Sequence, residues 1–151
     1  MLEQERFLKE YNLEQTFEKT GLSWQLLEQI YVDYKEKNYP RLQDLSGQLV
    51  AKLNQKKNNM RIERPGWGND VHVIYGRAKE PEHVIEKIIR KIGNEDSKKY
   101  RNIGVSDYKD VLSDLIGIRI IVIKKEGWRE ADDLIRTLSS KNFGRRSIWR
   151  I

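Results

Sequence analysis

The sequence contains no cysteine, which excludes disulfide bonds, thiolate catalysis and cysteine-bound zinc. It has only two histidines, His72 and His83, so a metal site built on several imidazole rings is not expected either. A metal bound by this chain would therefore have oxygen ligands.

Long apolar segments are missing as well. The longest apolar run, residues 115–123, is interrupted by Arg119 and has about half of the roughly 20 residues that a membrane helix needs. The first residues are charged and lack the apolar core of a secretory signal. We therefore expect a cytoplasmic protein that does not interact with a membrane through a spanning helix.

Charged residues, by contrast, are abundant. They make up 34% of the 151 residues, against about 25% in an average domain, so much of the surface must be charged helix. Lysine and arginine number 29 and aspartate and glutamate 23, which leaves a formal net charge of +6. This balance suits phosphate-rich partners such as nucleotides, nucleic acids or anionic membranes, but net charge alone does not choose among them.

The first 60 residues have the hydrophobic period of amphipathic helices. We expect three helices, over residues 2–19, 24–37 and 41–55, with Pro40 separating the last two. Residues 54–59 and 65–70 are rich in turn-forming residues and are expected to form a loop. The sequence thus predicts an N-terminal helical element, residues 1–60, which serves packing or forms the surface of a homo-oligomer.

The pattern changes at Val71 to short β-branched and aromatic segments. We expect a strand over residues 71–75, a turn at Gly76 and a helix over residues 81–92 that Pro81 opens. A short helix (105–112), a central strand covered on both faces (115–123), a helix (128–138) and a last strand (143–151) follow. This order predicts an α/β (α+β) fold for residues 61–151, a mixed sheet with flanking helices that forms one domain with the helical element.

Basic side chains gather around the start of the helix expected at residue 81. On that helix His83, Lys87 and Arg90 share one face, by the i, i+4, i+7 rule. Arg77 and Lys79 have the same parity in the extended segment before it and can project from one side, next to a helix N-terminus that favours an anion. Each residue taken singly is better explained as a charge on a solvated helix face, whereas the whole set matches the needs of a polyphosphate.

A second group lies at the start of the apolar run. Asp114 directly precedes the run, and Arg119 interrupts it on the same pleat face as Gly117, where another molecule could approach closely. Arg119 must be paired or bind an anion, so an ion pair with a carboxylate such as Asp114 and a ligand role both remain open. A single aspartate is weak support for Mg²⁺, which is usually held by one or two carboxylates together with phosphate oxygens and water.

Together, residues 76–91 and 114–119 resemble the first half of the RelA/SpoT-type (p)ppGpp synthetase domain, particularly that of the small alarmone synthetases of the stringent response. The resemblance covers residues 71–123 and implies a nucleotidyltransferase-like fold. It implies a GTP pyrophosphokinase, which transfers a pyrophosphate group from ATP to the 3′-hydroxyl of GDP or GTP. The residues that it implies for binding the phosphates of ATP are Arg77, Lys79, Lys87 and Arg90, with Arg119 as a further candidate. Asp114 is the residue that it implies for Mg²⁺ and for catalysis.

Two departures from the family pattern limit what the resemblance implies. His83 stands where the family usually has serine. The larger departure is that the segments which hold the acceptor guanine, and the glutamate that completes the metal and base chemistry, do not occur after Ile123. The resemblance therefore implies a partial synthetase domain, from a truncated or a degenerate homologue, that binds ATP but is inactive alone.

Two other functions are compatible with these residues. The same donor site would serve a toxin-like relative that transfers pyrophosphate to the 3′ end of a tRNA. A non-catalytic RNA-binding module would instead use the basic and aromatic residues Arg145, Arg146, Trp149 and Arg150. The 23 acidic residues and the helical spacing of most aromatic residues count against this module.

Overall fold

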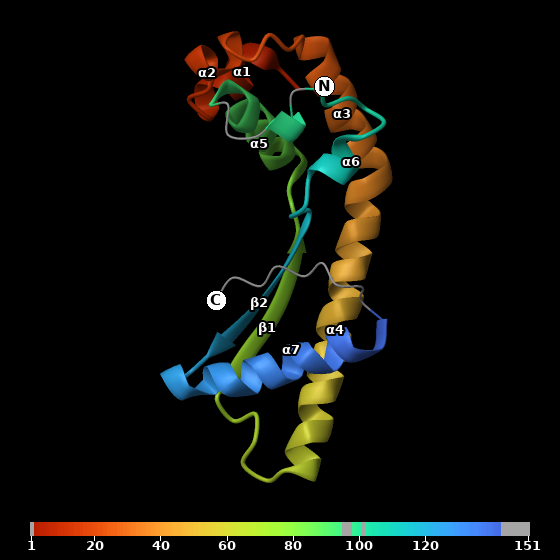
Figure 1. Cartoon of the computed structure of the whole chain (residues 1–151), viewed down its shortest axis with the longest axis vertical. Coiled ribbons are helices and arrows are strands. Elements are labelled where there is room, and N and C mark those ends of the chain that lie inside the picture. Colours follow the sequence, from red (N-terminus) through yellow and green to blue (C-terminus); the bar gives the residue numbers. More distant parts are fainter. Residues whose placement is uncertain (1, 95–97, 101, 143–151) are drawn as a thin grey trace. The chain divides into compact units, whose positions relative to one another are not determined.

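The computed structural model describes residues 2–94, 98–100 and 102–142, which form an α+β protein with a two-stranded antiparallel sheet (Figure 1). The chain divides into a first unit, residues 1–44 with 78–117, and a second unit, residues 45–77 with 118–151. The division expected near residue 60 lies within helix α4 (Tyr39–Glu63). The strand expected over residues 143–151 lies outside the described residues.

Short helices build most of the first unit. They are α1 (Gln4–Glu10), α2 (Glu14–Glu18), α3 (Trp24–Asp33), α5 (Pro81–Gly93), α6 (Tyr108–Val111) and a 3₁₀ turn at Lys98–Tyr100. Ser23 caps α3 by accepting a hydrogen bond of 3.2 Å from the Leu26 N–H, which satisfies one of the free donors of the first turn.

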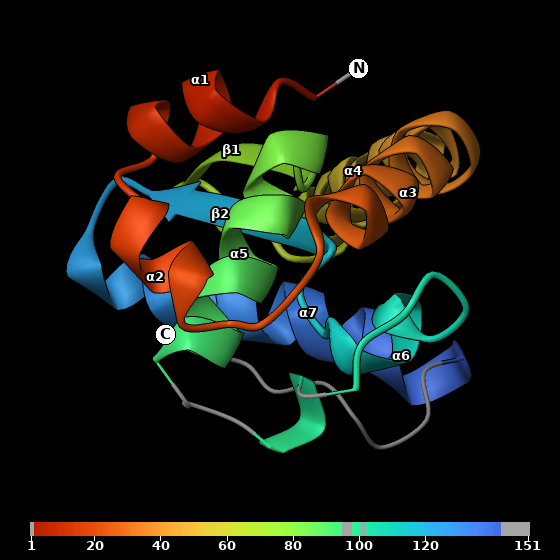
Figure 2. The ribbon, with the colours of Figure 1, turned by 90° about the horizontal axis from the view of Figure 1, so that it is seen from above.

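Helix α5 is the centre of this unit. It confirms the helix expected over residues 81–92, and its apolar stripe is fully buried against α2 and α3 (Figure 2). The stripe consists of Val84, Ile85, Ile88 and Ile89. Because these four residues recur with the helical period, their burial fixes which way the remaining faces of α5 point.

A π-helical turn, Tyr34–Asn38, joins α3 directly to α4, so the break expected at Pro40 is wrong. In this turn the N–H of Tyr39 donates to the carbonyl of Tyr34, five residues earlier. Pro40 follows at once, where the regular i→i−4 ladder is already interrupted. The N–H that proline lacks is therefore missing where it disturbs the helix least.

Helix α4 also continues through residues 54–59, where a loop was expected. Its buried residues Ser46, Leu53, Lys57 and Met60 follow one another at intervals of seven, four and three, which places them on one helix face. Leu53 and Met60 belong to the hydrophobic core of the second unit, together with Val71, Ile74 and Leu134. Burial of this face outweighs the weak helical preference of the asparagines between them, which is why the composition alone misled the prediction.

Strands β1 (Val71–Ala78) and β2 (Ile116–Val122) form the sheet, and helix α7 (Trp128–Asn142) follows β2 after a 3₁₀ turn at Lys125–Gly127. Backbone hydrogen bonds join Lys79 to Leu115 and Ile123 to Asp70. Between these two hydrogen bonds the chain advances by nine residues on the β1 side (79 − 70) and by eight residues on the β2 side (123 − 115). The β1 side therefore contains one extra residue, a β-bulge.

The exposure of β2 corrects one expectation. Its residues alternate between half-buried and exposed, so the run 115–123 is not a central strand covered on both faces. Among the described residues β2 pairs with β1 alone.

Gly76, which was predicted to form a turn, lies within β1. A Cβ atom at this position would collide with Ser46 Oγ and with Ile118 Cδ1. Over the described part of the chain, no helix has the length and apolarity needed to cross a membrane.

Candidate functional site

Two lysines and one aspartate of the first unit converge on each other, and we call them the Lys79–Asp114–Lys87 cluster. Lys79 directly follows β1, Lys87 lies on the second turn of α5, and Asp114 lies two residues before β2. The Lys79 Nζ donates to Asp114 Oδ2 at 3.3 Å, and the Lys87 Nζ donates to Asp114 Oδ1. The sequence had placed these residues in two separate motifs, and the structure brings the three side chains together.

The cluster is accessible from solvent and keeps its charges. The lysine side chains are 24% and 20% exposed and the aspartate side chain is 49% exposed. Burial raises the pKa of Asp114, but the hydrogen bond from Lys87 and the charges of both lysines outweigh that effect and hold the pKa below its ordinary value. At neutral pH the cluster therefore carries two positive charges and one negative charge, an excess that can attract an anion.

The backbone around Lys79 is fixed from two sides. Its N–H donates to the Leu115 carbonyl at 2.8 Å, and its own carbonyl accepts a hydrogen bond of 2.7 Å from the Tyr34 hydroxyl. Lys87 is fixed by the buried stripe of α5, on whose opposite side it lies. Both ammonium groups thus extend from well-packed elements, which reduces the entropy lost when a ligand is bound.

Two other residues expected at the site, Arg90 and His83, both pair with the carboxylate of Glu86. Arg90 Nη2 lies 3.0 Å from Glu86 Oε1, and His83 Nδ1 lies 2.8 Å from Glu86 Oε2. These contacts run along α5 between residues three and four positions apart. Glu86 therefore pairs with His83 and Arg90, the outer two of the three residues predicted to form a basic face, whereas the middle residue, Lys87, contacts Asp114.

Arg77 and Arg119 belong to the second unit. Arg77 is exposed at the end of β1, and its side chain makes no hydrogen bond or ion pair with any residue that the structure describes. Arg119 donates from Nη1 to the Tyr75 hydroxyl at 3.1 Å, and its guanidinium carbon lies 5.9 Å from the centre of that ring. Of the two roles that the sequence left open for Arg119, an ion pair with a described carboxylate of its own unit does not form. Arg119 is on the exposed face of β2 and needs no buried partner.

The donor set of the cluster fits Mg²⁺ in a limited way. Asp114 offers one ionised and half-exposed carboxylate, but each of its oxygens accepts a hydrogen bond from a lysine. Within the described part of the chain no group of three carboxylate, imidazole or thiol side chains is placed so that it could hold a metal ion. The cluster thus suits a magnesium ion that arrives with phosphate oxygens, and it does not form a cage for the metal alone.

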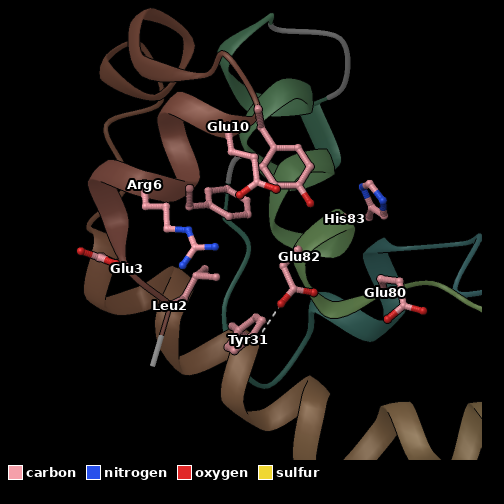
Figure 3. Close-up of a pocket in the computed structure, with 10 residues that line it drawn as sticks. Leu2, Glu3, Arg6, Glu10, Tyr31, Glu80, Glu82 and His83 are labelled. Carbon is pink, nitrogen blue, oxygen red and sulfur yellow. Dashed lines mark hydrogen bonds between the residues drawn. The ribbon is translucent and has the colours of Figure 1, made fainter.

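A pocket of about 450 Å³ lies in the same unit but has the opposite charge. Figure 3 shows Arg6 on α1 and Glu82 on α5 extending into it, and Tyr31 bonded to Glu82. Its lining residues are Leu2, Glu3, Arg6, Phe7, Glu10, Tyr11, Tyr31, Glu80, Glu82 and His83. Burial, followed by the charges of Glu10, Glu82 and Glu86, raises the pKa of Tyr11, which agrees with a negative potential there. The four glutamates of the lining would repel a triphosphate, so this pocket does not suit the binding of ATP phosphates.

Three buried or half-buried tyrosines of the first unit were not predicted as functional residues. Tyr34 and Tyr39 bond to the backbone or side chains of residues 79 and 80, and Tyr108 bonds to Asp33. The one available signal was the abundance of tyrosine between residues 31 and 39, which a periodicity argument counts as core.

Comparisons with protein-family models, with curated proteins and with solved structures found no match to this chain. The proposal below therefore depends on the side-chain geometry just described and on the resemblance of residues 76–91 and 114–119 to the synthetase motifs.

Proposed function

We propose that the Lys79–Asp114–Lys87 cluster binds the triphosphate of ATP, as the donor site of a pyrophosphokinase. The observation that carries this proposal is the convergence of two ammonium groups, from a strand end and from a helix, on one ionised carboxylate. The acceptor, the 3′-hydroxyl of GDP or GTP, comes from the sequence resemblance alone.

The proposed reaction requires charge neutralisation above all. A bond forms between the acceptor 3′-oxygen and the β-phosphorus of ATP, the bond from that phosphorus to the α-phosphate oxygen breaks, and AMP leaves as the hydroxyl proton is lost. Ammonium groups that contact the phosphate oxygens offset their charge and hold the chain of phosphates in place. Asp114 would hold Mg²⁺, which supplies further charge neutralisation on the phosphate oxygens.

ATP titration by calorimetry, with and without Mg²⁺, tests the donor site. Lys87→Gln is expected to weaken ATP binding at least about tenfold, since a hydrogen bond to a charged group is lost. Lys37→Gln is the matched control, because it removes another ammonium group of the first unit from its ion pair with an aspartate, Asp33. Synthesis from added GDP is expected to stay at background, because the acceptor motifs are missing from the sequence after Ile123.

Equal ATP affinity in the two variants would contradict this proposal. A tRNA acceptor would leave the ATP result unchanged and would give labelled tRNA when ATP with a labelled γ-phosphate is supplied. An RNA-binding module would respond to RNA and not to ATP. The residues that the sequence offers for that module, Arg145 to Arg150, lie outside the described residues.

A further inference from the structure

The segment that carries Lys79 is held by hydroxyl groups from a single helical region. Tyr34 donates to the Lys79 carbonyl at 2.7 Å and Tyr39 donates to Glu80 Oε1 at 2.7 Å. Tyr31, one turn earlier, donates to Glu82 Oε1 at 2.9 Å. Three phenols thus contact residues 79–82, where β1 ends and α5 begins.

The π turn explains how Tyr34 and Tyr39 reach the same segment. In a regular α-helix, residues five apart differ by about 140° around the axis, so their side chains would point to different sides. The i→i−5 hydrogen bond from the Tyr39 N–H to the Tyr34 carbonyl brings the fifth residue almost above the first. The two rings accordingly lie 6.0 Å apart between centres.

Tyr34 is better placed for this task than its neighbours. Its side chain is fully buried, so its hydroxyl has one fixed position, and it contacts a backbone carbonyl that the sheet leaves free. The same residue, Lys79, donates its N–H to Leu115, next to Asp114. The Lys79 backbone is therefore held between the tyrosine and the segment that carries the aspartate.

We propose that Tyr34 is a positioning residue for the donor site. By holding the Lys79 carbonyl, it keeps the Lys79 ammonium group beside Asp114 and Lys87, and the π turn serves to bring Tyr39 to the adjoining residue. This inference rests on the proposed function for its effect on ATP, whereas the placement of the Lys79 side chain can be measured without any nucleotide.

The test uses Tyr34→Phe, which removes one hydroxyl and keeps the ring. Its control is Tyr108→Phe, since Tyr108 is equally buried in the same unit but its hydroxyl bonds to Asp33 and Asn38. In the absence of ATP, the ¹⁵N resonance of the Lys79 ammonium group is expected to move toward that of exposed lysines in Tyr34→Phe alone. ATP affinity is expected to fall about fivefold in Tyr34→Phe and to stay unchanged in Tyr108→Phe.

The outcomes separate the two proposals. An unchanged Lys79 resonance in Tyr34→Phe overturns the positioning role whether or not ATP binds. A shifted resonance in a protein that does not bind ATP supports the positioning of Lys79 and rejects the donor site. Equal losses of ATP affinity in both phenylalanine variants would show a general effect of stability and overturn the inference. If Tyr34→Phe does not fold, Tyr34→Met removes the same hydroxyl and fills the site with an adaptable side chain, and an unchanged Lys79 resonance in that variant overturns the inference as well.

Discussion

At the scale of single residues, Asp114 is the group on which the site depends. It is the shared partner of two lysines that would otherwise repel each other at close range. Because the carboxylate is half exposed, solvent screens these contacts and each contributes modestly to stability. Its principal effect is to keep the two ammonium groups together.

Asp114→Asn gives a test of this effect through pH. The pKa of Asp114 is lower in the folded chain than its ordinary value, so the ionised carboxylate stabilises the fold above about pH 4, and this contribution is lost as the pH falls through the lowered pKa. The free energy of unfolding in urea is expected to be higher in the unsubstituted protein by on the order of 1 kcal/mol at neutral pH. The difference should disappear once the pH has fallen below that lowered pKa, because the carboxylate is then protonated in the folded and in the unfolded chain.

High salt and the titration of Asp114 itself provide the controls for that measurement. Raising the ionic strength should reduce the difference between the two proteins, since the pairs are partly screened. A difference that persists unchanged down to the acid limit would mean that Asp114 acts through packing and not through its charge.

At the scale of elements, the sequence predicts those whose periodicity is strong and uninterrupted. The stripe of isoleucine and valine in α5 and the near-continuous apolar run of β2 predicted both elements close to their observed bounds, although the run was wrongly expected to be covered on both faces. Helix α4 was missed across Pro40 and residues 54–59, because a π turn cannot be read from periodicity and burial of Leu53 and Met60 is a tertiary effect. Local preference was overruled there by packing.

The candidate site was predictable to a similar degree. Lys79, Lys87 and Asp114 were named from their motifs, although their contact needed the fold. The pairing of Arg90 with Glu86 could have been read from the sequence, because a glutamate four residues before an arginine on a helix is a known favourable pair. Nothing in the spacing of the tyrosines indicated which of them would contact the Lys79 backbone.

The contact between α4 and β1 in the second unit allows a prediction at this scale. Ser46 Oγ is buried without a hydrogen-bond partner in the described residues and faces Gly76. Gly76→Ala should lower the free energy of unfolding by about 1–3 kcal/mol through overpacking. Ser46→Ala should be neutral or stabilising by about 1 kcal/mol, because an unsatisfied hydroxyl is removed.

A double-mutant cycle measured by urea unfolding checks this contact. In the Ser46→Ala background Gly76→Ala should cost less, although the contact of the new methyl group with Ile118 remains. Strictly additive effects would show that the glycine is needed for another reason than its approach to Ser46.

At the scale of the whole molecule, the net charge of +6 and the local charges describe different properties. The excess of basic residues is moderate. Carboxylates dominate the pocket beside α1, whereas two lysines dominate the Lys79–Asp114–Lys87 cluster. Non-specific attraction to a polyanion depends on the total number of accessible cations. A triphosphate site depends on a few of them in one place, so the two kinds of binding can be separated.

Binding of single-stranded RNA at several salt concentrations tests that separation. Lys87→Gln and Lys37→Gln each lower the net charge from +6 to +5, so they should weaken RNA binding equally and change the salt slope by at most about 0.7. ATP binding should respond to Lys87→Gln alone. If instead Lys87→Gln weakened RNA binding far more than Lys37→Gln and left ATP unaffected, the cluster would be a contact for RNA phosphates. A diffuse electrostatic surface would instead lose the same RNA affinity in both variants, because each variant removes one positive charge.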